Sequence, residues 1–293
     1  MIKTIKEFLT SKFLRNDLIR NKEEIKLSIG KILCEVFKDK NFDNIQDYEF
    51  KIFSQFGEDG IIQYLINNLN ISSKNFIEFG VENYTEANTR FLLENDNWSG
   101  LILDSSLKNI NFIKKQNYYW RFDVLAVHSF ITPENINKIL KDNNYEGNIG
   151  ILSIDVDGND YWILNAIEIV NPDILIIEYN ANFGLNNSVS IKYQKNFSRS
   201  SKGLEKLIYG CSLAALNNLC KKKNYSLICC NKNGNNAFFV KNDLLNNKVK
   251  PISINKAYQK NSFKENFDDK GYPKKISSEE ITQILNSEKI LKV

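Results

Sequence analysis

Two aspartates follow an apolar stretch in the middle of the chain and suggest a site for a cation. Residues 152–162 read Leu-Ser-Ile-Asp-Val-Asp-Gly-Asn-Asp-Tyr-Trp, so that Asp155 and Asp157 follow a strand-like pattern. Side chains alternate between faces along a strand, and we therefore expect both carboxylates on one face. Two carboxylates placed in this way repel each other unless a cation or a proton lies between them.

The next strand pattern brings further oxygen atoms to the same edge. It ends in Ile-Ile-Glu-Tyr-Asn, in which Glu178 and Asn180 again share a face. Carboxylate and carboxamide oxygens are ligands of hard divalent cations, and neither motif contains a lysine or arginine. The alternative is a metal-free polar turn in which Asp160 caps the following helix. We predict a site for Mg²⁺ or Mn²⁺ made of four side chains, Asp155, Asp157, Glu178 and Asn180.

Short apolar runs of β type alternate with helical or polar stretches from residue 75 onwards. Four of the five runs are followed at once, or nearly so, by glycine or an acidic residue. In a parallel sheet flanked by helices, ligands bind in the crevice beyond the carboxyl ends of the strands. The repeated acidic residues therefore indicate a functional edge. The predicted strands are Phe76–Phe79, Gly100–Leu103, Tyr119–Phe122, Ile149–Ile154 and Ile174–Ile177.

The rest of the chain completes an α/β pattern. A polar loop over residues 181–206 precedes a predicted helix over 211–223. Two close strands follow, 226–230 and 237–240, and their short Gly-Asn connection is typical of an antiparallel hairpin. Five β/α units closed by a hairpin predict a mostly parallel sheet. A last helix is predicted over 278–291, capped by Ser277 or Ser278.

The N-terminal residues carry apolar side chains at helical spacing, over 2–18 and again over 25–37. We expect a helical extension that packs on the domain or on a second subunit, which would make the protein a homo-oligomer. Binding to an anionic membrane surface is the alternative.

The ends of the first two strands together are typical of a nucleoside site. The first strand ends in Glu78-Phe-Gly80, where a glycine lets the backbone approach a ligand closely. About 24 residues later, Asp104 ends the second strand at the distance at which an acid accepts both ribose hydroxyls of a nucleoside. Ser105, the next residue, is included in this site. The further glycines of a dinucleotide-binding loop are missing, and S-adenosylmethionine is the predicted cofactor.

Two residues near the third predicted strand are candidates for the same edge. Asp123 is expected to close that strand and to accept the amino hydrogens of adenine, whereas its alternative role is that of a turn or helix-capping residue. His128 is the one histidine of the chain. It is a candidate proton acceptor for a hydroxyl substrate, and its alternative is an incidental position.

Five segments form a recognisable set: Ser54–Gly60, Phe76–Gly80, Trp98–Asp104, Ile154–Trp162 and Ile177–Asn180. Together they resemble the FkbM-like class I S-adenosylmethionine-dependent methyltransferases, and most of all bacterial members associated with surface-glycan and capsule gene clusters. The resemblance covers roughly residues 50–245. It implies a Rossmann-like, seven-stranded sheet whose last two strands form an antiparallel hairpin.

The resemblance also implies roles for single residues. Glu78 and Gly80 would lie by the methionine end of the cofactor, and Asp104 would hold its ribose. Gln55 and Glu58 would be placed to close over the cofactor. The glycine-poor first loop, Gly-Val-Glu-Asn-Tyr, departs from the pattern of the family.

These observations predict an O-methyltransferase whose acceptor, by the resemblance, is a sugar in nucleotide-linked or glycan form or a capsule phosphoramidate precursor. A cation would lower the pKa of the acceptor hydroxyl, and Asp155 or His128 would take its proton. The alternative enzyme is a glycosyltransferase whose Asp-x-Asp motif holds Mn²⁺ and a nucleotide sugar, although such a fold needs neither Glu78 nor Asp104. A non-catalytic nucleoside-binding scaffold would tolerate replacement of the acidic residues.

Composition narrows the class of protein. Residues 1–40 and 248–293 each carry ten basic and six acidic residues, so the centre of this +4 chain is mildly acidic, which disfavours a nucleic-acid binder. Five cysteines without CxxC spacing argue against a disulfide framework or a structural zinc site.

No apolar run is long enough for a membrane span, and no signal-peptide pattern follows Met1, so we expect a cytoplasmic protein. The expected parts are a helical extension (1–50), a methyltransferase domain (51–247) and a basic tail with one helix (248–293).

Overall fold

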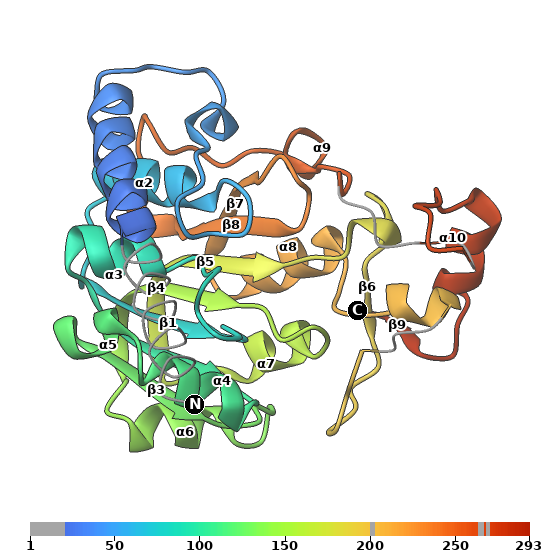
Figure 1. The fold of residues 1–293 in the computed structure, drawn as a ribbon. Coiled ribbons are helices and arrows are strands. Elements are labelled where there is room, and N and C mark those ends of the chain that lie inside the picture. The colour runs from blue at the N-terminus through green and yellow to red at the C-terminus, as the bar shows by residue number, and fades with distance from the viewer. Residues whose placement is uncertain (1–20, 200–202, 263–266, 268–269) are drawn as a thin grey trace.

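The computed structural model describes residues 21–199, 203–262, 267 and 270–293, and a seven-stranded sheet forms its centre (Figure 1). The strand order is β3-β2-β1-β4-β5-β8-β7. Neighbours from β3 to β5 are parallel, whereas β8 pairs antiparallel with both β5 and β7. The predicted α/β fold with a mostly parallel sheet and a closing hairpin is confirmed. The strands are β1 (Asn75–Phe79), β2 (Ser99–Asp104), β3 (Val124–His128), β4 (Gly147–Ile154), β5 (Val170–Glu178), β7 (Tyr225–Cys230) and β8 (Asn236–Lys241).

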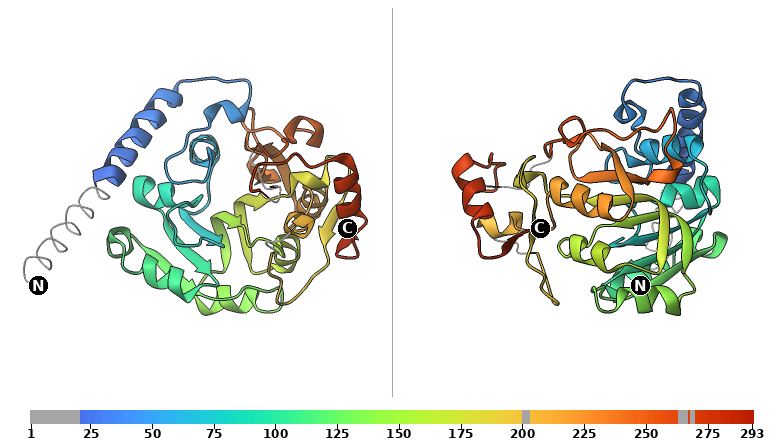
Figure 2. Two further views of the ribbon diagram at one scale, coloured as in Figure 1. Left: turned by 45° about the vertical axis from the view of Figure 1, so that its right-hand side comes forward. Right: turned by 180° about the vertical axis from the view of Figure 1, so that it is seen from behind.

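Helices cover both faces of this sheet (Figure 2). On one face, α2 to α5 pack with the strands around buried side chains such as Ile61 and Ile110. On the other face, α6 to α8 pack around Ile136 and Leu216. Strands buried on both faces read as near-continuous apolar runs, which is why they were recognisable. The helices are α2 (Glu58–Asn68), α3 (Arg90–Asp96), α4 (Leu107–Ile113), α5 (Asn117–Arg121), α6 (Ile136–Asp142), α7 (Asp160–Ala166), α8 (Leu213–Lys222) and α9 (Ile254–Ala257), with 3₁₀ turns η1 (Ile45–Tyr48) and η4 (Asn242–Leu244).

The third strand lies one segment later than predicted. Residues 119–121 belong to α5, and the amide of Phe122 donates to the carbonyl oxygen of Tyr118. The neighbouring run, Val124–His128, is the strand that pairs with β2. The prediction of a strand over Tyr119–Phe122 is therefore wrong. Aromatic residues favour strands only in so far as they fit a sheet, and here they pack as a helical turn.

The C-terminal residues form a small layer beside the main sheet (Figure 1). Helix α10 (Ser278–Leu285) begins with the capping box of Ser277 and Glu280, which confirms the predicted cap. It ends earlier than predicted, and β9 (Ile290–Lys292) pairs antiparallel with β6 (Val189–Ile191). The segment expected to be one polar loop thus contains β6 and the turns η2 (Ala181–Phe183) and η3 (Gly203–Leu207).

The N-terminal extension is helical over residues 21–38, and the predicted helix before it lies outside the described residues. One face of this helix packs on Phe50, Phe53 and Phe91. Gly30 lies at the contact, where a Cβ would be 2.5 Å from the ring of Phe91. In the described part of the chain, no helix has the length and apolar character needed to cross a membrane.

Candidate active site at the carboxyl edge of the sheet

The ends of β1 and β4 meet at Gly80. This residue has a φ of +73°, and a Cβ would lie 1.5 Å from the carbonyl oxygen of Asp155. Glycine alone fits both the positive φ and the close approach. The contact brings the residues that follow both strands to the wall of one cavity.

Glu78 is a buried carboxylate that accepts three hydrogen bonds. One oxygen accepts from the amide of Asn88 at 2.8 Å, and the other accepts from the amide (3.1 Å) and hydroxyl (2.5 Å) of Thr89. Burial nevertheless raises the pKa of Glu78 to about 7. Glu78 lines the cavity, and its predicted place beside the cofactor stays a prediction.

Asp104 ends β2 in a similar way. Its Oδ2 accepts from the amide of Glu82 at 2.8 Å, and its Oδ1 accepts from the amide of Ser106 at 2.8 Å and from Asn109 Nδ2 at 3.2 Å. A carboxylate offers about four acceptor positions, so about one remains for a ligand hydroxyl. Asp104, Glu82 and the following Ser105 line a cavity of about 250 Å³.

Three carboxylates gather at the ends of β4 and β5. One oxygen each of Asp155, Asp157 and Glu178 lies within 4.8 Å of the others. Glu178 is 8% exposed, and its Oε2 is buried without a hydrogen-bond partner. Burial, and then the neighbouring carboxylates, raise the pKa values of Asp155 and Glu178 well above their ordinary range. The cluster therefore holds a proton or accepts a cation.

A tight turn, and not a straight strand, brings Asp157 into this cluster. β4 ends at Ile154, and Asp157 adopts a left-handed backbone with a φ of +58°. Asp160 closes the turn, because its two oxygens accept from the amides of Val156 (2.8 Å) and Gly158 (3.0 Å). The polar turn and the acidic cluster, predicted as alternatives, are thus present together, although the N-cap position of α7 is Asn159 and Asp160 is the first residue of the helix.

Arg199 is a charged member of the site that the sequence did not reveal. Its Nη1 donates to Asp157 Oδ1 at 3.1 Å, and its guanidinium lies 3.6 Å from the centre of the Tyr209 ring. Its Nε donates to the carbonyl oxygen of Lys206. The arginine lies far along the chain in a polar loop, so no local spacing links it to Asp157.

Asn180 is not placed as the predicted fourth ligand. Its Oδ1 accepts from the amide of Asn182, and its Nδ2 donates to the carbonyl oxygens of Leu207 and Tyr209. The carboxamide is buried and absent from the walls of both cavities at this edge. The prediction assumed that Asn180 continues the strand and shares a face with Glu178. The chain instead turns into η2 directly after Asn180, so the carboxamide does not reach the acidic cluster.

Gln55 and Glu58 differ in their access to the site. Gln55 lines the cavity next to the acidic cluster. Glu58 is fully buried and accepts from Asn231 Nδ2 at 2.6 Å and from Asn236 Nδ2 at 2.9 Å. Glu58 therefore joins α2 to the β7–β8 hairpin and does not contact the cavity, contrary to its predicted place over the cofactor.

Asp123 and His128 lie away from the cluster. Asp123 was expected to end the third strand and to contact adenine there. It instead precedes β3, at the amino edge of the sheet, so the reason for this predicted contact no longer holds. His128 ends β3 beside Asp104, and its Nε2 lies 3.0 Å from the carbonyl oxygen of Ser105. Three strand spacings, about 14 Å, separate β3 from β4, so His128 does not share a proton path with Asp155.

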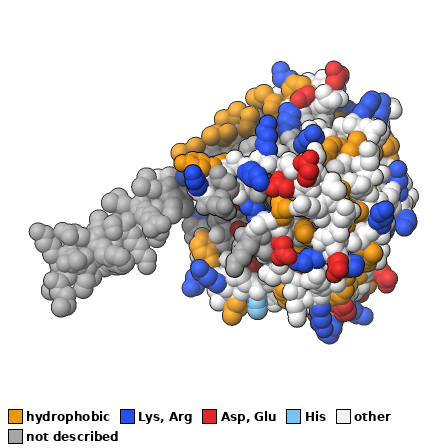
Figure 3. Space-filling view, turned by 90° about the vertical axis from the view of Figure 1, so that its right-hand side faces the viewer, with side chains coloured by type: hydrophobic (Ala, Val, Ile, Leu, Met, Phe, Trp, Pro, Cys, Tyr) orange, Lys and Arg blue, Asp and Glu red, His pale blue; other side chains and the backbone are white. Residues whose placement is uncertain are grey.

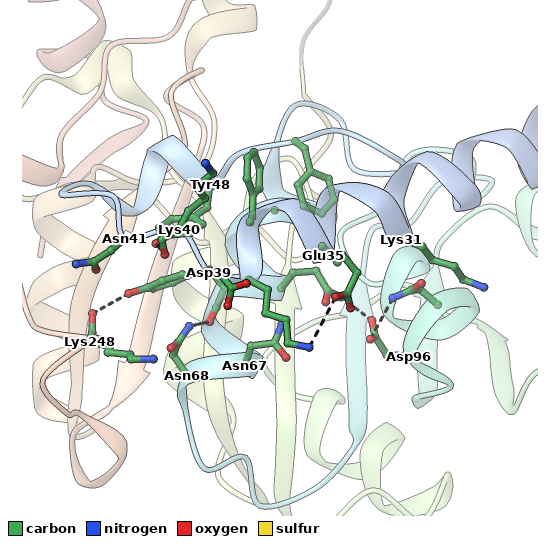
Figure 4. Close-up of a pocket in the computed structure, with 18 residues that line it drawn as sticks. Lys31, Glu35, Asp39, Lys40, Asn41, Tyr48, Asn67, Asn68, Asp96 and Lys248 are labelled. Atoms are coloured by element: carbon green, nitrogen blue, oxygen red, sulfur yellow. Dashed lines mark hydrogen bonds and ion pairs between the residues drawn. The ribbon is translucent and has the colours of Figure 1, made fainter.

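Two adjoining cavities define the candidate site. The cavity at Asp104 and a second one of about 210 Å³ at Glu178 share Gly80, Glu82, Asp155 and Asp157. A larger cavity of about 930 Å³ lies under the N-terminal helix (Figure 4). Its lysine, carboxylate and carboxamide side chains include pairs such as Glu35–Lys38, and it contains no cluster of convergent carboxylates. We therefore place the site at the smaller cavities, on chemistry and not on volume.

Comparison with known proteins bears on the kind of enzyme that carries this site. Residues 55–189 match the family model described as the Methyltransferase FkbM domain, which spans β1 to β5 and the carboxylates that follow them. No curated protein matches the chain.

Solved structures show a general likeness. The O-methyltransferase from Bacillus cereus in complex with SAH is 13% identical, with a TM-score of 0.41, and the match covers 75% of this chain and 91% of that one. The SAH-bound N-terminal domain of EvdMO1 is 12% identical, with a TM-score of 0.43, covering 74% and 94%. A methyltransferase from Clostridium acetobutylicum is 10% identical, with a TM-score of 0.39, covering 70% and 94%. The assignment rests on the family match and not on these scores: by that match, the chain is a methyltransferase.

Proposed function

We propose that the protein is an S-adenosylmethionine-dependent O-methyltransferase that acts on a hydroxyl of a sugar or surface-glycan precursor with the help of a divalent cation. The observation that supports this most is the sharing of residues between the two cavities. Asp155 and Asp157 belong to the wall of both, so a cofactor beside Asp104 and an acceptor beside Glu178 would meet at the acidic cluster.

The first cavity suits a nucleoside cofactor. Asp104 is held rigidly by three donors and keeps about one acceptor position for a ribose hydroxyl. Glu78 and Gly80 line the adjoining cavity, where they would face the methionine end of the cofactor. When bound, S-adenosylmethionine supplies an activated methyl group, so the chain has chiefly to orient the acceptor and take up its proton.

The acidic cluster suits a divalent cation. Its three carboxylates supply oxygen ligands, and the unpartnered Oε2 of Glu178 is a buried acceptor that lacks a donor. Asp155, Asp157 and Glu178 would hold the ion, which would polarise the acceptor hydroxyl. Asp155 lies at the junction of the cavities and would accept the hydroxyl proton on a carboxylate oxygen.

The second cavity suits an acceptor with many hydroxyl groups. Besides the cluster it is lined by carboxamides and carboxylates that include Gln55, Glu86, Asn88, Asn235 and Asn236. These side chains both donate and accept hydrogen bonds, as recognition of a sugar requires. The sugar or glycan class of the acceptor rests on this lining and on the resemblance of the sequence.

Equilibrium binding and turnover test the proposal. We expect saturable binding of S-adenosylhomocysteine in calorimetry and none of UDP or GDP. Methyl transfer to sugar acceptors should stop in EDTA and return with Mg²⁺ or Mn²⁺. Binding of UDP or GDP without S-adenosylhomocysteine would favour a glycosyltransferase, and full activity in EDTA would exclude the role of the cation.

A further inference from the structure

The N-terminal helix has two apolar faces. Its inner face packs on the domain through Leu27, Cys34 and Phe37. The opposite face exposes Ile25 (60%), Ile29 (47%), Ile32 (61%) and Val36 (49%). Figure 3 shows a continuous apolar run along this helix, next to the atoms that are not described.

The exposed residues form one narrow stripe. Their spacing of four, three and four residues keeps all four within about 60° of the helix circumference. This is the spacing of a coiled-coil seam. The spacing indicates that the surface that covers the stripe is another helix with the same repeat.

The charged residues at the two ends of the seam indicate which helix covers the stripe and in which orientation. The next seam position before Ile25 is Lys22, and the next one after Val36 is Asp39, and both are exposed. In an antiparallel pair, Lys22 of each copy lies opposite Asp39 of the other, with Ile25 opposite Val36 and Ile29 opposite Ile32. In a parallel pair, Lys22 would face Lys22 and Asp39 would face Asp39, which is repulsive.

The remaining charges argue against a membrane surface as the partner. Over residues 21–39, the exposed charged side chains are three lysines and three acidic residues, so this face has no net charge. Helices that lie on anionic membranes carry an excess of lysine or arginine on the polar face.

We propose that the exposed stripe of the N-terminal helix is the interface of a homodimer, in which the helices of two copies pair antiparallel. The seam from Ile25 to Val36 is about three turns long, so it buries less than a standard interface of about 1,600 Å². The dimer should therefore dissociate on dilution.

Sedimentation velocity of the full chain over a range of concentrations tests the dimer. The native protein should shift from monomer to dimer as the concentration rises. Ile29→Glu places a carboxylate at the centre of the seam and should leave a monomer. Leu107→Glu changes a residue of similar exposure (56%) on α4 and should leave the dimer intact. At a concentration at which the native protein is a monomer, circular dichroism melting should be unchanged in both variants, because neither side chain is buried in the single chain.

Charge reversal tests the orientation of the helices. Lys22→Glu and Asp39→Lys should each weaken the dimer, and the double variant should restore it. Ile25→Cys combined with Val36→Cys should give a covalent dimer under mild oxidation, whereas either cysteine alone should not. A monomer at every concentration, or a dimer that Ile29→Glu leaves unchanged, would overturn the proposal. Binding of the native protein to anionic vesicles without dimer formation would do so as well.

Discussion

The carboxylates in the two halves of the carboxyl edge differ in their supply of hydrogen-bond donors. At the ends of β1 and β2, Glu78 and Asp104 each accept three hydrogen bonds, from the loops that follow these strands and from Asn109 of α4. Beyond β4 and β5, Asp155, Asp157 and Glu178 face one another, and one oxygen of Glu178 has no donor. The first half is a set of fixed acceptors, whereas the second half is a cluster of mutually repelling carboxylates with Arg199 paired to Asp157 at its side.

The supply of backbone amides explains this difference. The loops after β1 and β2 turn their N–H groups toward Glu78 and Asp104. The turn after β4 gives two of its N–H groups to Asp160, which closes the turn and is absent from the walls of both cavities. A fixed acceptor binds neutral hydroxyl groups, and a donor-poor cluster binds a cation. The predictions that follow use variants to separate the two functions.

The largest effect is expected from Asp155→Asn. Loss of this carboxylate removes both a cation ligand and the proposed proton acceptor, so turnover should fall by about a thousandfold. Asp157 is exposed and paired with Arg199, and Asp157→Asn should cost about a hundredfold. Binding of S-adenosylhomocysteine should stay within a few-fold in both variants. Asp123→Asn, at the amino edge, is the matched control and should keep full activity.

Glu78 gives the clearest pH dependence. Its folded pKa of about 7 lies above the unfolded value of 4.5, so the folded state binds more protons between these pH values. The free energy of unfolding should therefore fall as the pH rises from 4.5 to 7, by up to about 3 kcal/mol from this group. In Glu78→Gln this part of the pH dependence should disappear in urea titrations. Glu146→Gln, an exposed control, should retain it; a Glu78→Gln curve parallel to the native one would contradict the assignment.

A smaller loss is expected from Asp104→Asn in the fixed half of the edge. About one acceptor position is open to the ribose, so the affinity for S-adenosylhomocysteine should fall by 1.5–3 kcal/mol, or about 10- to 150-fold. Cation binding, measured with Mn²⁺, should not change. If calorimetry finds the native dissociation constant in a folded Asp104→Asn protein, the cofactor does not bind there.

The fold could be predicted from the sequence because buried elements have recognisable patterns of apolar residues over short stretches of the chain. Parallel strands such as β1, β4 and β5 are apolar on both faces, and the hairpin is marked by its short connection. The strand over 119–122 was wrong because a helical turn of aromatic residues has the same composition as a strand. The β6–β9 pair was missed, since its two three-residue strands lie about a hundred residues apart and have no period to recognise.

The site could be predicted only where strand ends determine it. Asp155 and Glu178 follow adjacent parallel strands, so their proximity follows from topology. Asn180 lies two residues beyond Glu178, and its role depends on the carbonyl oxygens of residues 207 and 209, which no local spacing reveals. The same holds for Arg199, whose contact with Asp157 spans 42 residues.

Arg199 provides the most sensitive test of the difference between the two halves. Its guanidinium supplies the acidic cluster with positive charge at Asp157, the place where a cation would bind. The arginine and the ion would therefore compete for the same carboxylate. Arg199→Ala should release Asp157 and strengthen Mn²⁺ binding, whereas every carboxylate variant of the cluster should weaken it.

The expected gain is small, because the pair is partly exposed: 27% of the Arg199 side chain and 64% of the Asp157 side chain are accessible. Exposed ion pairs contribute less than about 1 kcal/mol, so Mn²⁺ should bind about two- to fivefold more tightly. Arg199→Lys keeps the charge but loses the planar contact with Tyr209, and its affinity for Mn²⁺ should lie between the two. Electron paramagnetic resonance of free Mn²⁺ measures this without turnover. Weaker binding in Arg199→Ala would show that the arginine organises the cluster and does not compete with the ion. If the affinity for S-adenosylhomocysteine is unchanged in both variants, the substitutions affect only the β4–β5 half of the edge and not the cofactor half.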